Sequence, residues 1–400
     1  MPPASRLAVA YACIGHFLHH VLTGSFLTLA VVLERAWTLP YDAVIALWTW
    51  GALLVGLGAP LAGWLADRFG NARMMAAFFL GAGGATVAAS RVAGPDGMAA
   101  ALAALGAFGA IYHPVGMSWV SRAAPVAARG RVMGLLGISG SFGVAGAALL
   151  AGGLADVAGW RAALLVPGLV SLGVGLALML AIRRGQVADA RGSRGPVPAT
   201  AEDQDRAPIG VLVVLAITFC LGSLLYNAFA TATPKWISEA LSLGGEAGRL
   251  GLLVSLVFLA GSVGQILGGF LADRYPLKWL YVLTFLCKLP LLLAAGLVGG
   301  PAALAIAAMV VLMLDLGAPV ENLLLAQYSS GRRRGLAFGV KFAMGFAAAP
   351  LGVNLVAAMW GTGGGFGPFF LVLAALTLTM LVTALFLPGA PRPATVPAAA

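Results

Sequence analysis

Charged residues are scarce in this chain. Of its 400 residues only 10% are Asp, Glu, Lys or Arg, whereas 60% are hydrophobic, and the mean hydropathy is +0.96. A soluble domain carries about 25% charged residues, so this composition excludes an ordinary soluble protein. The chain instead contains apolar runs long enough to cross a bilayer, which takes about 20 residues in a helix. The composition therefore predicts a membrane protein with many spans.

Cysteine is also rare, and Cys13, Cys220 and Cys287 each lie in a different apolar segment. An odd number without metal-type spacing argues against a disulfide framework and predicts small packing residues. The first apolar stretch runs to about Leu33, too long for the apolar core of a signal peptide, so we expect a retained first helix. Neither a P-loop nor a nucleophile–base constellation is found. We therefore expect no ATP-driven pump, no enzyme and no cofactor.

Apolar runs between turn signals predict twelve membrane helices. The first six cover 7–33, 43–66, 73–91, 98–121, 131–155 and 160–182, and the second six cover 209–232, 249–272, 277–299, 302–328, 335–358 and 367–387. Between the sets lies a long polar, Pro- and Gly-rich stretch, 183–208, which we interpret as a flexible linker. The sequence thus predicts an all-α membrane protein with two six-helix bundles, 1–182 and 209–400, and a short tail.

The formal net charge of +10 could indicate a nucleic-acid-binding protein, but the positions of the basic residues argue otherwise. Of the 24 Lys and Arg, five fall on one side of the predicted membrane, two lie inside helices, and the remaining 17 gather on the other side. This bias is the positive-inside signature. We expect both termini and the linker to be cytoplasmic, in a bacterial-type inner membrane, with lipid contacts and no nucleic-acid partner.

The two halves of the chain resemble each other. GWLADRFG at 63–70 matches GFLADRYP at 269–276, an offset of 206, and RGRVMG at 129–134 matches RGLAFG at 334–339, an offset of 205. Similar loops at corresponding positions indicate a duplicated six-helix unit. Parallel repeats of this kind are characteristic of one large class of secondary transporters.

The loop GWLADRFGNAR resembles the signature loop between helices two and three of the major facilitator superfamily. In the second copy Pro276 replaces a glycine of that pattern. A narrower resemblance, to exporters of the fosmidomycin-resistance type, rests on GHFLHH in the first helix and AIYHPVGMSWVSR in the fourth. These resemblances imply a twelve-helix secondary transporter whose two halves rock around a central cavity. In that fold helices one, four, seven and ten line the cavity, while three, six, nine and twelve lie outside, so Lys288 on the ninth would be an exception.

The resemblance also implies a gating role for the signature loop and its repeat. The glycine would let helix two approach a neighbour, and the aspartate would pair with an arginine or with a helix end of the other bundle. The alternative is that these residues only set topology and end helices. The candidate gating residues are Gly63, Asp67, Arg68, Arg73, Gly269, Asp273 and Arg274. We expect the two aspartates at equivalent positions on the cytoplasmic side.

The fifth predicted helix has a glycine at every third position from Gly134 to Gly146. Small residues at such spacing let membrane helices pack backbone to backbone. Antiporters of the superfamily often end this pattern with Gly-Pro, where this chain has Ala147 and Ala148. The pattern therefore favours close packing over an antiport-specific motif.

Charges inside the predicted helices are costly and usually face a cavity or each other. Lys288 and Asp315 fall near the middle of helices nine and ten. Glu321 and Lys341 each lie ten residues from Gly331 in the connecting loop, which puts them at the same depth in an antiparallel hairpin. We predict a Glu321–Lys341 ion pair, serving either proton or substrate binding or structure alone.

Three of the four histidines lie in GHFLHHV, residues 15–21, on one polar face of the first helix. His113 of the fourth helix should reach nearly the depth of His16. Imidazole titrates in the physiological range, so we expect His16, His20 and His113 to line the cavity and to bind protons or substrate. Hydrogen bonding between packed helices is one alternative. A copper-type metal ion, suited by residues spaced four apart, is another.

These patterns predict proton-coupled export of a small organic or drug-like compound by a monomer. An importer of a nutrient or metal chelate, and a scaffold or sensor without transport, are the alternatives. The predicted substrate- or proton-binding residues are His16, His20, His113, Asn227, Asp315, Glu321 and Lys341.

Overall fold

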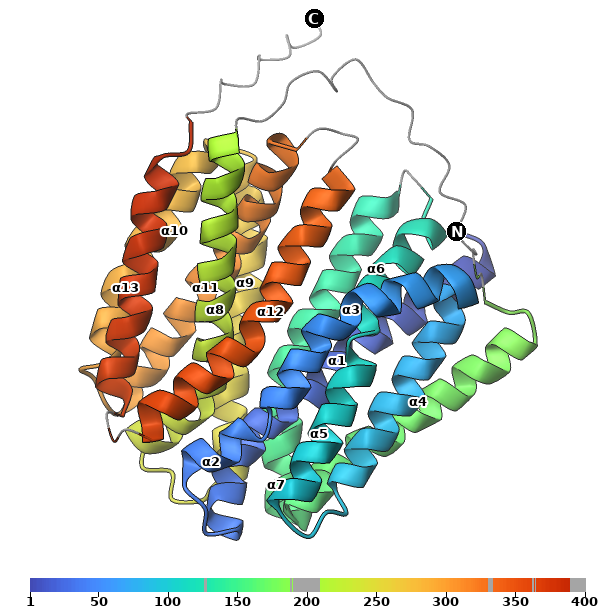
Figure 1. Ribbon diagram of the computed structural model, residues 1–400, viewed down its shortest axis with the longest axis horizontal. Helices are drawn as coiled ribbons and strands as arrows, with labels where there is room; N and C mark the ends of the chain where they lie inside the picture. The colour runs from blue at the N-terminus through green and yellow to red at the C-terminus, as the bar shows by residue number, and fades with distance from the viewer. Residues whose placement is uncertain are drawn as a thin grey trace, which may run out of the picture.

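The computed structural model describes residues 1–125, 128–187, 189, 209–329, 334–361, 363 and 365–388. Every regular element in this described part is a helix, and Figure 1 shows the helices as two groups, α1–α7 and α8–α13. The N-terminal bundle contains α1 (Pro3–Ala36), α2 (Tyr41–Ala46), α3 (Thr49–Phe69), α4 (Asn71–Ala89), α5 (Pro95–Gly109), α6 (Tyr112–Ala123) and α7 (Arg129–Arg183). The C-terminal bundle contains α8 (Ile209–Ala240), α9 (Ala247–Ala272), α10 (Leu277–Ala295), α11 (Pro301–Gln327), α12 (Arg334–Gly361) and α13 (Phe366–Leu385).

Over the described residues these thirteen helices make twelve membrane spans. The pairs α2–α3 and α5–α6 each form one span, interrupted at 47–48 and at 110–111. Conversely, α7 contains two spans, because the chain turns at Gly159, whose φ of 81° lies in the left-handed region that glycine adopts without steric cost. The prediction of twelve membrane helices is confirmed over the described residues, although it contained neither interruption.

The predicted end of the seventh helix was wrong. We expected the helix to end at 232, shortly before Pro234, whereas α8 continues to Ala240. Proline is tolerated inside membrane helices, where neighbouring groups satisfy the backbone that it frees. As a result Lys235 lies within a helix and not in a loop. The predicted linker, 183–208, and the C-terminal tail fall largely outside the described residues.

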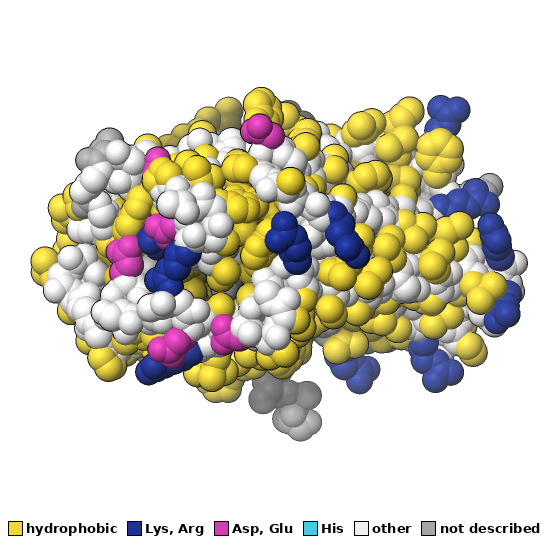
Figure 2. All heavy atoms as spheres, turned by 90° about the horizontal axis from the view of Figure 1, so that it is seen from below, with side chains coloured by type: hydrophobic (Ala, Val, Ile, Leu, Met, Phe, Trp, Pro, Cys, Tyr) yellow, Lys and Arg dark blue, Asp and Glu magenta, His cyan; other side chains and the backbone are white. Residues whose placement is uncertain are grey.

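Two opposite faces of the molecule are distinguished below. Both α1 and α8 begin on the side that we call the terminal face, which is the upper side in Figure 1. The opposite side, which we call the far face, contains α2 and the turn at Gly159. Figure 2 views the far face, where hydrophobic side chains predominate; acidic side chains lie next to basic ones on the left of the view, and only basic side chains are seen on the right.

The two bundles contact each other on the far face. Here α7 crosses α9 at Gly152 and Gly251, and a Cβ added at Gly152 would overlap the backbone of Ala247 and Gly251. Nearby, Asp156 Oδ2 accepts a hydrogen bond of 2.8 Å from the backbone N–H of Gly248. Gly248 is in the first turn of α9, where the helix dipole favours a carboxylate. Glycine and a helix-end charge thus hold two bundles in close contact.

Neighbouring glycines of α7 should respond differently to substitution. We expect Gly152→Ala to lower the free energy of unfolding by about 1–3 kcal/mol, because its methyl group would press on the backbone of α9. Gly153→Ala is the matched control, since a Cβ there meets nothing within 4 Å. Thermal unfolding of the detergent-solubilised protein measures both. Equal midpoints for the two variants would contradict the tight α7–α9 crossing.

Candidate functional site

A cavity of about 480 Å³ lies between the two bundles. This volume is in the range of sites that bind small molecules. The N-terminal bundle lines it with α1, α3, α6 and α7, and the C-terminal bundle with α8 to α12. Membrane helices one, four, seven and ten, which are α1, α5–α6, α8 and α11, therefore line the cavity, as the resemblance implied. Other helices line it too. Both bundles supply the wall, so motion between them would change the shape of the cavity.

An ion pair with its hydrogen bonds lies on the cavity wall that the C-terminal bundle forms. Glu321 Oε1 lies 2.6 Å from Lys341 Nζ, which confirms the predicted ion pair between α11 and α12. The other carboxylate oxygen accepts a hydrogen bond of 3.3 Å from the Tyr281 hydroxyl. Lys341 Nζ also donates to Asn322 Oδ1 at 2.6 Å. Both oxygens of one carboxylate are therefore held by groups from separate helices.

A second charge network lies deeper in the same wall. Lys288, only 4% exposed, lines the cavity together with Asp315 and interacts electrostatically with Asp315 and Glu321. The Asp315 carboxylate lies directly against Gly261 of α9, where a side chain would leave it no space. Asn227 of α8 also faces the cavity, and its amide donates to the Ser223 carbonyl at 2.8 Å. The sequence left the partner of Lys288 undecided.

Lys288 shows that α10 lines the cavity. The resemblance places the ninth membrane helix outside, yet Tyr281, Thr284 and Phe285 of α10 also form part of the wall. The expectation for this helix was therefore wrong. A buried ammonium requires a polar surrounding, and the cavity carboxylates provide it.

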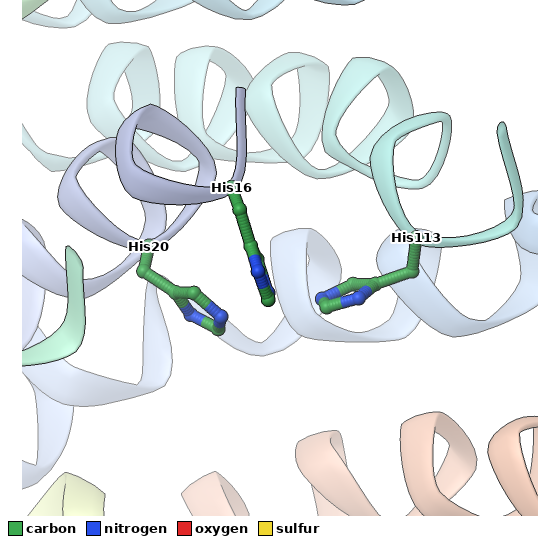
Figure 3. A group of neighbouring side chains, drawn as sticks. All are labelled: His16, His20 and His113. Atoms are coloured by element: carbon green, nitrogen blue, oxygen red, sulfur yellow. The ribbon is translucent and has the colours of Figure 1, made fainter. Parts of the chain in front are cut away.

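A cluster of four imidazoles lies at the opposite, N-terminal wall, and three of them line the cavity. His19, His20 and His113 line the cavity, and in every pair of the four histidines except His16–His19 the ring centroids lie 4.7 to 5.7 Å apart. The predicted match in depth between His16 and His113 is confirmed, with their centroids 5.4 Å apart. In Figure 3 the rings of His16, His20 and His113 converge from α1 and α6.

His16 does not line the cavity, contrary to the prediction. Its Nδ1 lies 2.7 Å from the Leu136 carbonyl of α7, and its ring stacks on Tyr112 at 5.0 Å. His19 takes a place in the wall instead, with its Nδ1 unpartnered among the described atoms. The polar arc of α1 is wide enough that one edge faces α7 and the rest faces the cavity. The helical periodicity alone did not distinguish these directions.

The signature loop is organised differently from the prediction. Asp67 pairs with Arg122 of α6 at 3.4 Å, which is in its own bundle and was not among the expected partners. Arg68 lies over the Trp64 and Phe69 rings, and Arg73 is exposed. A Cβ at Gly63 would come 3.9 Å from Pro114, an ordinary van der Waals distance, so the predicted close approach is not seen in this structure. The signature loop thus joins α3 to α6 in this state.

The repeat of the signature loop, residues 269–276, also differs from the prediction. Asp273 is exposed at the end of α9, and Arg274 Nη1 donates to the Phe270 carbonyl at 3.1 Å. Gly269 has nothing within 4 Å of an added Cβ, so it makes no close approach either. Gly268 makes the close approach instead, against the backbone of Leu316. The glycine that faces α11 is therefore one residue earlier in α9 than predicted.

The sequence missed an ion pair that joins the bundles on the far face. Lys235 Nζ lies 2.8 and 2.6 Å from the two carboxylate oxygens of Glu34 and 3.2 Å from Glu239 Oε1. The ammonium also lies 5.3 Å from the Tyr41 ring centroid and 5.2 Å from that of Trp360. We call Glu34, Lys235, Glu239, Tyr41 and Trp360 the far-face cluster. Lys235 lies in TPKW, residues 233–236. It could have indicated this ion pair only if the seventh helix had been predicted to continue past 232.

Comparison with known proteins identifies the family. A family model described as Major Facilitator Superfamily matches residues 12–317 and 215–400. The chain is also similar to a bacterial homologue of the human lysosomal transporter Spinster, solved in inward-facing unoccupied and occupied conformations, with TM-scores of 0.69 and 0.71. Each comparison has 17% identity and covers 96% of this chain and 95% of that one. At this identity the likeness shows the fold alone. No curated protein matches the chain.

The Glu321–Lys341 pair should be strongly non-additive on mutation. We expect Glu321→Gln and Lys341→Met each to lower the free energy of unfolding by about 1–3 kcal/mol, because each leaves a largely buried partner unsatisfied. The double variant should lose less than the sum of the two. Thermal unfolding in detergent measures all three variants.

An exposed pair provides the control for this experiment. Glu246 and Arg249 are 3.2 Å apart with side chains more than half exposed, so Glu246→Gln and Arg249→Met should have small effects. If the losses at 321 and 341 were additive, the coupling between the two charges would be absent and the interpretation wrong.

Proposed function

The chain belongs to the major facilitator superfamily and is a membrane transporter, and we propose that it exports a small organic compound across a bacterial inner membrane in exchange for protons. The observation that carries the proposal is the cavity between the bundles, with two carboxylates and two ammonium groups on one wall and imidazoles on the other. Such groups are costly in a membrane and mark pathways for ions and substrates.

The carboxylates of α11 are suited to proton coupling. Asp315 and Glu321 both face the cavity, and each has a lysine as electrostatic partner. A deprotonated carboxylate can attract a cationic or hydrogen-bond-donating group of the substrate. Protonation of the carboxylate removes that attraction, so the substrate leaves when the proton binds. Proton binding and substrate binding would then alternate at the same wall.

The opposite wall is suited to substrate contact. His20 and His113 present imidazoles to the cavity, and Asn227 of the C-terminal bundle lies on the same cavity surface. The resemblance of GHFLHH and AIYHPVGMSWVSR to the fosmidomycin-resistance exporters supports export as the direction. Most of the remaining wall is apolar, which favours an organic compound with few charged groups.

The far-face contacts suggest how access alternates. They hold the bundles together in this structure, so we infer that the cavity communicates with the terminal face, which the positive-inside bias assigns to the cytoplasm. Opening toward the far face requires the Lys235–Glu34 contact to break. The far-face cluster therefore serves as the outer gate.

Transport in proteoliposomes tests the proposed coupling. A panel of small organic compounds is offered with and without an imposed pH gradient. We expect Asp315→Asn to lose gradient-driven transport at least about tenfold while it still exchanges substrate at equilibrium, because an amide cannot carry a proton. Asp96→Asn is the control, since Asp96 is exposed at the start of α5 and outside the cavity.

Two results would contradict the coupling. A compound that equilibrates through the wild-type protein without responding to the pH gradient would exclude proton exchange. Full gradient-driven transport by Asp315→Asn would exclude this carboxylate as the coupling group.

Cross-linking tests the outer gate. In a variant without Cys13, Cys220 and Cys287, cysteines at Glu34 and Lys235 are joined by a short bifunctional maleimide. We expect transport to stop after cross-linking, because Glu34 is in α1 and Lys235 in α8, on opposite sides of the bundle interface.

The control places both cysteines in one helix. The control variant carries Lys235→Cys and Glu239→Cys, both in α8. Cross-linking should leave its transport rate equal to that of the same variant before cross-linking. Undiminished transport by the cross-linked Glu34→Cys, Lys235→Cys variant would show that the far face need not open.

A further inference from the structure

We propose that His16, His20 and His113 bind a first-row transition-metal ion of the Co²⁺, Ni²⁺ or Zn²⁺ class at the N-terminal wall of the cavity. One ring nitrogen of each residue lies within 4.8 Å of the corresponding nitrogens of the other two. Figure 3 shows that the three rings point toward a common volume. Imidazole nitrogens suit transition metals, whereas Mg²⁺ and Ca²⁺ prefer oxygen ligands. This inference does not depend on the proposed transport cycle.

The hydrogen bond of His16 orients one nitrogen for ligation. Its Nδ1 lies 2.7 Å from the Leu136 carbonyl, which can only accept, so Nδ1 carries the proton and Nε2 has a free lone pair. Metal-binding histidines usually donate their other ring N–H to a carbonyl or carboxylate in this way. The backbone of α7 therefore fixes both the tautomer and the direction of this ligand.

Gly140 of α7 provides the space that this arrangement needs. A Cβ at Gly140 would overlap the ring of His16, so a side chain there would displace the imidazole from its position. The ring is also packed against Tyr112, with 19° between the two planes. His16 is thus held between α7 and α6.

The other two ligands lie where an ion can reach them. His20 and His113 are on the cavity wall, whereas His16 lies behind them. In a tetrahedral site the ligand nitrogens lie about 2.0–2.1 Å from the metal, which places them about 3.4 Å apart. Small rotations of His20 and His113 toward the fixed His16 would close the present spacing. Three protein ligands leave a fourth position for water or for a donor group in the cavity.

Cobalt absorption tests the site directly. The full chain is purified without a polyhistidine tag and titrated with Co²⁺, whose visible bands report nitrogen ligation and a tetrahedral site. We expect saturable binding of one equivalent, displaced by Zn²⁺ and unaffected by Mg²⁺. Substitution of Gln for His16, His20 or His113 should weaken binding about tenfold or more. Failure of the wild-type protein to bind Co²⁺ would overturn the proposal.

Two matched pairs separate ligation from loss of folding. His19→Gln removes an imidazole on the same helix but outside the three ligands, and should keep the affinity. Gly140→Ala keeps every histidine but displaces the His16 ring and should weaken Co²⁺ binding, whereas Gly137→Ala, with nothing within 4 Å of its Cβ, should not. Equal affinity in Gly140→Ala and Gly137→Ala, or equal loss in His19→Gln and His16→Gln, would overturn the assignment of these three ligands.

Discussion

A charge inside the bilayer must have a partner, and this requirement organises the polar part of the protein. Lys341 lies against Glu321, Lys235 against Glu34, and Lys288 interacts with Asp315. Each of these three pairs joins different helices, and Lys235 also contacts Glu239 of its own helix. The pairs therefore fix how the helices face one another. They also define where the wall of the cavity can change its shape.

The arrangement of glycines complements the arrangement of charges. Along α7 the glycines contact α1 near the histidines and α9 near the far face, so one helix brings both the imidazoles and the second bundle close. Helices joined by a charged pair are kept apart by long side chains, whereas helices that meet at a glycine come into backbone contact. The residues of α7 that line the cavity are Val144, Ala147 and Ala148, and glycines of α1 and α9, Gly24 and Gly251, pack against the two alanines. This site of a degenerate antiporter motif thus forms cavity wall.

The sequence predicted features with a strong local signal and missed those that depend on side-chain direction. Twelve spans follow from apolar length, and the Glu321–Lys341 pair follows from equal distance to a loop. The interruptions of helices two and four, by contrast, leave apolar length unchanged and have no comparable signal. His16 faces α7 and Gly268 replaces Gly269 because rotations of one residue decide which helix is contacted. The role of Lys235 was missed because the seventh helix was predicted to end at 232, whereas α8 continues to Ala240.

The far-face cluster has a consequence for the history of the duplicated chain. The offset of 205 residues that relates two of the repeated segments maps Glu34 onto Glu239, and both carboxylates contact the same ammonium of Lys235. The same offset maps Lys235 onto Ala30, so the cation has no counterpart in the first half. Two identical subunits meeting here about a twofold axis would have brought like charges together. In one polypeptide the two halves can differ, so a single lysine on one side neutralises both carboxylates.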